Sequence, residues 1–221
     1  MMKTIGILGG MGPMATVDFM TKLYQALPVE NEQEHLRVLV DSNPAVPDRT
    51  LAILHNEPEP VVSQLTQMAQ GLINQGAHLL AVACNTAHYF LPVVERNLSI
   101  EFVNMISVTL DAVSDCRQVG VLATDGTLAA GLYRRKHVPF LYPDAEAQKL
   151  LMTAIYGFKA GEVELSRQQA KEVYRHLKTR GAETVIAACT ELPLLLEGVE
   201  IIDPGELLAR KLVEMAVAGE R

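Results

Sequence analysis

Two stretches of the chain share one pattern: Gly76-Ala77 … Ala83-Cys84-Asn85-Thr86 and Gly181-Ala182 … Ala188-Cys189-Thr190-Glu191. In each stretch, an apolar run that is typical of a buried strand ends in a cysteine and enters a turn with polar residues. The stretches lie about half the chain apart, as expected for a duplicated fold with approximate two-fold symmetry. Such symmetry would bring Cys84 and Cys189 to opposite walls of one cleft, where two thiols can transfer protons from both sides.

The composition is that of an ordinary globular protein. The chain has 221 residues, enough for two small lobes with a core each, and 49% of them are hydrophobic and 20% charged. The net charge of −7 offers no basic surface for nucleic acid, and no lysine-rich amphipathic segment points to a membrane. The first ten residues are too few and too rich in glycine for a signal peptide or a membrane span. We therefore expect a cytoplasmic protein whose partner is a small molecule, not nucleic acid or a membrane.

Alternating strand and helix patterns predict an α/β fold with two similar Rossmann-like lobes, whose parallel sheets are covered by helices on both faces. The expected strands span residues 4–8, 36–40, 78–83, 101–103, 118–122, 138–141, 184–188 and 199–202. The expected helices span residues 13–27, 60–74, 107–114, 144–156, 162–178 and 190–196, with one more from residue 85 or 86 and a last one from Asp203-Pro204. We expect an N-terminal lobe at residues 1–105, a C-terminal lobe at 106–203, and a final helix, 204–221, that packs back on the first lobe. The segment 41–49 contains two prolines and is expected to be a loop beside the site.

Ligands of such sheets bind at the carboxyl ends of the strands, where Cys84 and Cys189 both fall. A thiol between a strand and a helix meets free backbone N–H groups and the positive end of the helix dipole. We therefore expect a stabilised thiolate relative to the usual cysteine pKa of about 8.5. Packing is the plainer interpretation for either cysteine alone, but their repetition favours chemistry. Asn85-Thr86 and Thr190-Glu191 follow directly, and they can cap helices or turn toward a bound carboxylate.

Other reactive residues have plainer interpretations. The three cysteines lack the paired spacing of zinc or redox sites, and Cys116 has no counterpart in the other half, so we expect reduced thiols and a structural Cys116. His88 shares a predicted helix face with Cys84, where a structural or surface role is more usual than acid–base chemistry. Histidines and carboxylates are not spaced as in a metal site.

The glycine-rich loop 9–13 allows two interpretations. Gly10-x-Gly12-x-x-Ala15 after a strand matches the dinucleotide-binding fingerprint, with Asp41 at the end of the second strand. Pro13 interrupts that fingerprint, and a nicotinamide enzyme would leave both cysteines without a role. We therefore favour a loop around Met11 whose bare amides approach a carboxylate.

Two cations are candidates for binding a second carboxylate. Arg49 lies in the proline-rich segment, and Lys159 follows Tyr156-Gly157-Phe158 at the end of a predicted helix. Both residue types form charge-assisted hydrogen bonds with carboxylates, although most such residues are simply solvated.

Several motifs together resemble one known family. They are Gly9-Gly10-Met11-Gly12-Pro13-Met14-Ala15-Thr16, Pro47-Asp48-Arg49-Thr50, Cys84-Asn85-Thr86-Ala87-His88, Thr124-Asp125-Gly126-Thr127 and Cys189-Thr190-Glu191-Leu192-Pro193. With these motifs spread over nearly the whole chain, the sequence resembles the aspartate/glutamate racemase superfamily, and most closely its aspartate racemase branch. Ala188 stands where the family often has glycine, beside an intact Cys189.

The resemblance implies two α/β lobes related by pseudo-two-fold symmetry, an active site in the cleft between them, a homodimer, and neither pyridoxal phosphate nor a metal as cofactor. It implies that Cys84 and Cys189 are the catalytic acid and base. The substrate-binding residues that it implies are Asn85, Thr86 and Thr190 around the α-carboxylate and amine, Arg49 and Lys159 near the distal carboxylate, and Met11 and Thr127.

The expected activity is therefore cofactor-independent racemisation of an acidic amino acid, with aspartate as the preferred candidate. One cysteine, as thiolate, would remove the α-proton while the other delivers a proton to the opposite face. Because the α-proton is only weakly acidic, the site must exclude water and surround the developing charge with donors and cations. The alternatives are racemisation of another amino acid or a hydantoin, isomerisation of a small diacid such as maleate, and carboxylate binding without turnover.

Overall fold

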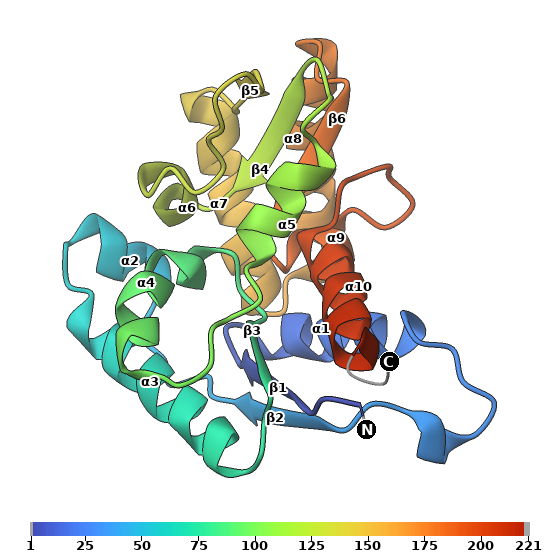
Figure 1. Ribbon diagram of the computed structural model, residues 1–221. Helices are drawn as coiled ribbons and strands as arrows, with labels where there is room; N and C mark the ends of the chain where they lie inside the picture. Colours follow the sequence, from blue (N-terminus) through green and yellow to red (C-terminus); the bar gives the residue numbers. More distant parts are fainter. Residues whose placement is uncertain (1, 219–221) are drawn as a thin grey trace.

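The computed structural model describes residues 2–218, which form two α/β lobes, one above the other in Figure 1. The lower lobe begins with β1 (Ile5–Gly9), α1 (Pro13–Gln25), η1 (Glu32–Glu34), β2 (Val38–Ser42), α2 (Arg49–Leu54), α3 (Glu59–Asn74), β3 (Leu79–Val82), η2 (Thr86–Tyr89), α4 (Leu91–Val94) and η3 (Glu95–Asn97). There follow α5 (Met105–Ala112), β4 (Val119–Ala123), α6 (Asp125–Ala129), β5 (Phe140–Leu141), α7 (Ala145–Lys159), α8 (Val163–Thr179), β6 (Thr184–Ala188), α9 (Leu192–Leu195) and α10 (Pro204–Val217). The predicted α/β fold with two lobes is confirmed. The predicted first lobe includes residue 1 and the predicted last helix includes residues 219–221, and these residues lie outside the described part of the chain.

The two sheets, both parallel, repeat one strand order. In the first sheet β1 lies between β2 and β3, and Phe102 adds a bridge to Leu80 of β3. In the second sheet β4 lies between β5 and β6, and Ile202 adds a bridge to Ile186 of β6. The side chains of β1, β3 and β4 are buried along their whole length, as expected for sheets with helices on both faces. The repeated order gives the carboxyl ends of β3 and β6 equivalent positions in the two lobes.

Two predicted strands are reduced to single bridges, the strand predicted at 138–141 is cut to the two residues of β5, and the one predicted at 36–40 lies two residues later, as β2. Residues 101–103 and 199–202 each contribute only the single bridge described above. Each is followed directly by a helix N-cap residue, Asn104 or Asp203. The side chains of these two residues accept hydrogen bonds from the first turns of α5 and α10. The turn into these helices takes the backbone away from the sheet after one pairing.

The segment 41–49 is not a loop throughout. β2 extends into its start, and α2 begins at its last residue, Arg49. The Asp48 side chain starts this helix by accepting a hydrogen bond from Leu51 N at 3.0 Å. The expectation of an irregular segment is therefore wrong at Arg49, whose backbone is fixed in a first helical turn.

The helices that follow the two cysteines are short. After Cys84, η2 leads into the single turn of α4, and after Cys189 comes the equally short α9. Pro92 and Pro193 lie in these helices and lack the backbone N–H of an ordinary helical residue. Such short helices align few peptide dipoles toward the thiols.

Among the described residues, no helix combines the length and the apolar surface that a membrane span needs.

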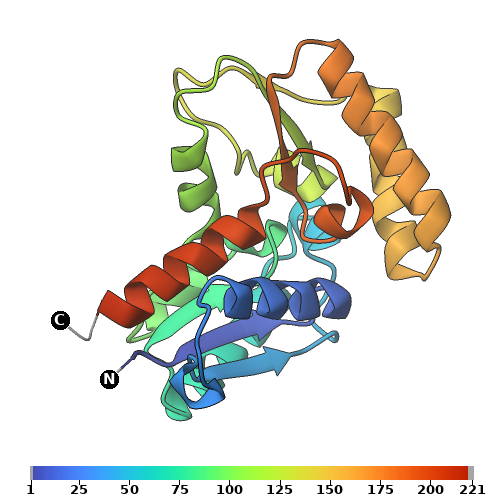
Figure 2. The ribbon, with the colours of Figure 1, turned by 90° about the vertical axis from the view of Figure 1, so that its right-hand side faces the viewer.

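The last helix crosses back over the lower lobe, as Figure 2 shows. Leu208 and Leu212 of α10 pack with Phe19 of α1 in one buried cluster on a face of the first sheet. Met105 packs in that same cluster, whereas its neighbour Ile106 packs with the side chains of β4. We therefore propose that the boundary between the lobes lies between residues 105 and 106.

The lobes approach closely where α2 faces α6. A Cβ atom on Gly126 of α6 would lie 2.7 Å from Thr50 Cα of α2, so only glycine permits this approach. Tyr156 of α7 reaches across the same boundary, and its hydroxyl donates to Asp48 Oδ2 at 3.1 Å. These contacts hold the two lobes together beside the space at the ends of the sheets.

Candidate active site

A small cavity lies between the lobes, at the carboxyl ends of both sheets. Its lining consists of Met11, Asp48, Arg49, Thr50, Cys84, Asn85, Thr86, Thr124, Tyr156, Lys159, Cys189, Thr190 and Glu191. This set contains every predicted site residue except Thr127. The free volume at its centre is about 10 Å³, roughly what one water molecule needs. The lining side chains therefore fill the centre of the site almost completely.

Cys84 and Cys189 enter this cavity from different lobes. Cys84 follows shortly after β3, and Cys189 comes directly after β6. Each is only 5% exposed, and both are free thiols. The fold thus brings two thiols from equivalent strands to the wall of one cavity.

Glu191 is a buried carboxylate of the cavity, 2% exposed, for which the sequence suggested helix capping or an approach to a bound carboxylate. The Cys189 thiol donates to Glu191 Oε2 at 3.0 Å. Glu191 Oε1 accepts from Gly12 N at 3.1 Å and lies 3.7 Å from Lys159 Nζ. In the sequence, only its place two residues after Cys189 could have indicated this contact with the thiol. Its other partners lie far away along the chain, because Gly12 belongs to the other lobe and Lys159 to a separate helix.

Cys189 is held in its protonated form. Burial, and then the charge of Glu191, raise the pKa of the Cys189 thiol well above its ordinary value, although Lys159 partly opposes them. The expectation of a stabilised thiolate is therefore wrong for Cys189. The short α9 offers little dipole, and loss of solvation together with a neighbouring carboxylate decides the protonation state. A protonated thiol at the cavity wall is suited to deliver a proton.

Lys159 is the ammonium group nearest to this chemistry. Burial lowers the pKa of Lys159, but the charges of Glu191, Cys189 and Cys84 outweigh burial, so the pKa is raised overall. The ammonium nitrogen also lies 5.4 Å from the centre of the Tyr156 ring. Lys159 therefore stays charged beside both thiols.

Arg49 lines the cavity but uses most of its guanidinium on the backbone. Nη1 donates to the carbonyls of Val46 and Pro47 at 3.0 Å each, and Nη2 donates to Met11 O at 3.3 Å. Its Nε is buried and has no hydrogen-bond partner within residues 2–218. Arg49 thus joins two loops and has fewer donors free for a ligand than its sequence position suggests.

Asn85 and Thr86 contact the upper lobe. Thr86 Oγ1 lies 2.9 Å from the hydroxyl oxygens of both Thr124 and Thr127. Thr127 therefore stands behind Thr86 and outside the cavity lining. Asn85 Oδ1 accepts a hydrogen bond from Tyr133 at 2.5 Å, while Asn85 Nδ2 is buried without a partner in the described part of the chain. A ligand with an acceptor atom would satisfy that amide.

The remaining lining residues come from loops and helix ends. Met11 is 2% exposed, and the Thr190 hydroxyl donates to Glu191 Oε2 at 3.4 Å. The cavity is also lined by four residues for which we predicted no site role: Asp48, Thr50, Thr124 and Tyr156. Asp48 and Thr124 cap α2 and α6, so a capping pattern was the signal available for them.

His88 links backbone groups and does not reach the cavity lining. Its Nδ1 pairs with Cys84 O at 2.9 Å, and its Nε2 accepts from Met105 N at 3.1 Å. These partners assign the neutral tautomer with hydrogen on Nδ1. Burial lowers the pKa of His88 to about 4, against the opposing effect of backbone hydrogen bonds. His88 thus joins the Cys84 backbone to the first residue of α5.

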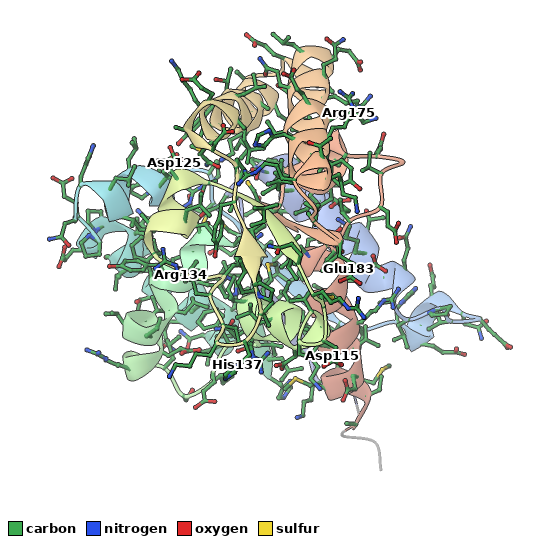
Figure 3. The ribbon with its side chains drawn as sticks, turned by 90° about the horizontal axis from the view of Figure 1, so that it is seen from above. Asp115, Asp125, Arg134, His137, Arg175 and Glu183 are labelled. Carbon is green, nitrogen blue, oxygen red and sulfur yellow. The ribbon has the colours of Figure 1, made fainter. Side chains whose placement is uncertain are left out.

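Cys116 also lies outside the cavity lining. Burial, and then the carboxylates of Glu183 and Asp115, both labelled in Figure 3, raise the pKa of its thiol. Within residues 2–218, no three His, Cys, Asp or Glu side chains are grouped so that they could hold a metal ion.

Fold and site together define a class: a two-lobed α/β protein with two buried thiols on one cavity between its lobes. Residues 8–212 match the family described as Asp/Glu/Hydantoin racemase. The chain belongs to this family of isomerases. The match confirms the resemblance found in the sequence and replaces the dinucleotide-binding interpretation of the glycine-rich loop.

Individual relatives are similar over almost their full length. The structure of an aspartate racemase from Picrophilus torridus is 30% identical with a TM-score of 0.87, covering 97% of this chain and 94% of that one. An aspartate racemase homologue from Pyrococcus horikoshii is 26% identical with a TM-score of 0.74, covering 97% and 99% of the two chains. The broad specificity amino-acid racemase RacX of Bacillus subtilis is 25% identical over 97% of this chain and 98% of its own length.

Proposed function

We propose that this protein racemises an acidic amino acid without a cofactor, with aspartate as the preferred substrate, and that Cys84 and Cys189 act on opposite faces of the α-carbon. The observation that carries the proposal is that both thiols line one cavity between the lobes. The similarity to a protein described as an aspartate racemase supports the choice of substrate.

The proposed proton transfers give each thiol one role, and the protonated state of Cys189 makes it the proton donor. In one direction the Cys84 thiolate removes the α-proton, so the C–H bond breaks, an S–H bond forms, and the electron pair spreads into the α-carboxylate. Cys189, protonated at rest, delivers its proton to the other face and is left as thiolate. The opposite enantiomer reverses these steps, and the Cys189 proton can first pass to Glu191 along their 3.0 Å hydrogen bond.

Substrate binding uses the donors that the protein leaves unsatisfied. Asn85 Nδ2 donates to the α-carboxylate, whose developing charge it stabilises in the planar intermediate. Lys159 binds the distal carboxylate, sharing its charge between the substrate and Glu191. Arg49 contributes its free Nε beside Lys159. Thr86 and Thr190 lie around the α-carbon substituents, and Thr127 acts by holding Thr86.

Water is kept from the reaction by the fit of the two lobes. The free volume of about 10 Å³ is too small for an amino acid, so the lobes must separate for substrate to enter and close again for chemistry.

We also propose a cytoplasmic homodimer, on the strength of the family resemblance and of the free thiols.

A second candidate is racemisation of a wider set of amino acids. The similarity to a protein described as a broad specificity racemase favours it. A cavity of about 190 Å³ adjoins the site, sharing Lys159 and Glu191 with it, and its other walls include Pro13, Met14 and Phe158. This space could accommodate a larger or less polar side chain.

The deciding experiment incubates the protein with individual amino acids in deuterated water without added cofactor. We expect incorporation of deuterium at the α-carbon together with loss of enantiomeric purity, fastest with aspartate. Cys84→Ala and Cys189→Ala should each abolish racemisation but leave exchange on one enantiomer, catalysed by the surviving thiol. The Cys116→Ala variant is the control and should behave as wild type. Near-normal racemisation by either active-site variant would refute the two-thiol scheme, and wild type without exchange on any amino acid would refute the activity.

A further inference from the structure

Tyr133 contacts the candidate active site from the upper lobe, although the sequence gives no reason to expect it there. Tyr133 lies after α6 and directly before Arg134, which Figure 3 labels. The Tyr133 side chain is 2% exposed. Its hydroxyl donates to Asn85 Oδ1 at 2.5 Å. The Tyr142 hydroxyl in turn donates to Tyr133 O at 2.8 Å, which anchors the tyrosine backbone.

This hydrogen bond holds the Asn85 amide with Oδ1 toward Tyr133. A side-chain amide has an acceptor oxygen and a donor nitrogen, and a flip exchanges them. Burial raises the pKa of Tyr133, so the phenol keeps its proton and offers a donor. A donating phenol pairs with Oδ1, and Nδ2 is then turned away from it.

Asn85 Nδ2 is therefore left as a buried donor without a partner in the described part of the chain. Buried amides without partners are rare, because desolvation without a hydrogen bond is unfavourable. Asn85 is also part of the cavity lining, so a ligand carboxylate there would supply the missing acceptor. With the amide flipped, Oδ1 would instead repel that carboxylate.

We propose that Tyr133 is a positioning residue, which orients Asn85 so that Nδ2 donates to the α-carboxylate of the substrate; this inference rests on the proposed function. The hydrogen bond crosses from one lobe to the other, so it forms only when the lobes are closed. Substrate recognition by Asn85 is thereby coupled to closure of the site.

The test is a double-mutant cycle on kcat and KM, using the amino acid that wild type racemises fastest. Tyr133→Phe removes only the hydroxyl, which leaves the Asn85 amide free to turn away from the substrate carboxylate. We expect kcat/KM to fall roughly 10- to 100-fold, the usual cost of losing a hydrogen bond to a charged group, here the one from Asn85 to that carboxylate. In the Asn85→Ala background the same change should alter kcat/KM less than about two-fold, because its effect passes through Asn85. If turnover of Asn85→Ala is too slow to measure, calorimetric binding of L-aspartate completes the same cycle.

Tyr174→Phe is the matched control, since its hydroxyl donates to Glu200 O at 3.1 Å and contacts neither Tyr133 nor Asn85. Its kcat/KM should stay within about three-fold of wild type. Asn85→Asp gives a second route if Tyr133→Phe does not fold, because its carboxylate still accepts from Tyr133 but offers no donor. We expect Asn85→Asp to fold with the far-UV circular dichroism of wild type, at a lowered melting temperature, and to lose activity.

Two outcomes overturn the inference alone: additive effects of Tyr133→Phe and Asn85→Ala in an active enzyme, or an Asn85→Asp variant with normal kcat/KM. A wild-type protein without exchange or racemisation of any amino acid overturns the proposed function, and the inference with it.

Discussion

The protonation of Cys189 depends on two neighbours of opposite charge. Beyond the effect of burial, which raises the thiol pKa most, Glu191 accepts the thiol hydrogen and raises the pKa further, while Lys159 lowers it. Because these residues also contact each other, a substrate carboxylate that draws Lys159 toward itself changes the balance at the thiol. The acid and base roles are therefore set by a group of three side chains and not by the cysteine alone.

We expect the pKa of Cys189 to fall in Glu191→Gln and to rise in Lys159→Met. The first change removes the negative charge that disfavours the thiolate, and the second removes the positive charge that favours it. Thiolate absorbance against pH measures this in a Cys84→Ala/Cys116→Ala background, where Cys189 is the remaining cysteine. Glu197→Gln, which changes an exposed carboxylate on the same lobe, serves as control. A pKa that moved in the opposite direction in either variant would contradict this account.

The connection between η2 and α5 is made by one buried imidazole. His88 bonds to Cys84 O in one lobe and to Met105 N at the start of α5, where the chain passes to the other lobe. Protonation would place a hydrogen on Nε2, which could then no longer accept from Met105. This contact therefore requires the neutral ring.

The stability of the protein should consequently fall in mild acid. The pKa of His88 is about 4 in the folded state, below the usual 6.5, so the unfolded chain binds a proton between these values while the folded chain does not. Stability is unaffected by this residue above pH 6.5 and is lost as pH falls toward 4, by about 3 kcal/mol. Urea unfolding at pH 7 and pH 4 measures the loss. It should be reduced in His88→Gln and retained in His55→Gln, which changes an exposed histidine. Equal pH dependence in wild type and His88→Gln would rule out this role.

The molecule as a whole works as two bodies that meet around a nearly filled space. The contacts that cross between them include Gly12 with Glu191, the Thr86 hydroxyl with those of Thr124 and Thr127, and Tyr133 with Asn85. Many of these contacts involve residues of the cavity wall. The contacts between the lobes and the candidate site are therefore built largely from the same residues.

Hindering closure should reduce activity without unfolding either lobe. In Gly126→Ala the new methyl group would lie 2.7 Å from Thr50 Cα, so α2 and α6 must move apart. We expect kcat/KM to fall roughly 100-fold, the cost of displacing reacting groups by about 1 Å. The control is Gly71→Ala in α3, where nothing lies within 4 Å of the new atom, and it should keep full activity. Unchanged kinetics in Gly126→Ala would show that this approach is not needed for catalysis.

The sequence was a good guide to the elements that carry their own periodic pattern. The apolar runs before Cys84 and Cys189 predicted β3 and β6, and the repeat predicted two lobes, because buried parallel strands are apolar on both faces. It was a poor guide where one residue changes the path of the chain. Asn104 and Asp203 cut two expected strands to single bridges, and Asp48 turned part of an expected loop into α2.

By itself, the sequence determined the fold class, the family, and the position of both cysteines at the carboxyl ends of parallel strands. Only the tertiary structure decided that burial and Glu191 raise the pKa of Cys189, that Arg49 bonds mainly to the backbone, and that Tyr133 donates to Asn85. The physical reason is distance along the chain. Periodic patterns report burial within one element, whereas protonation states and amide orientation depend on groups that meet only after both lobes have folded together.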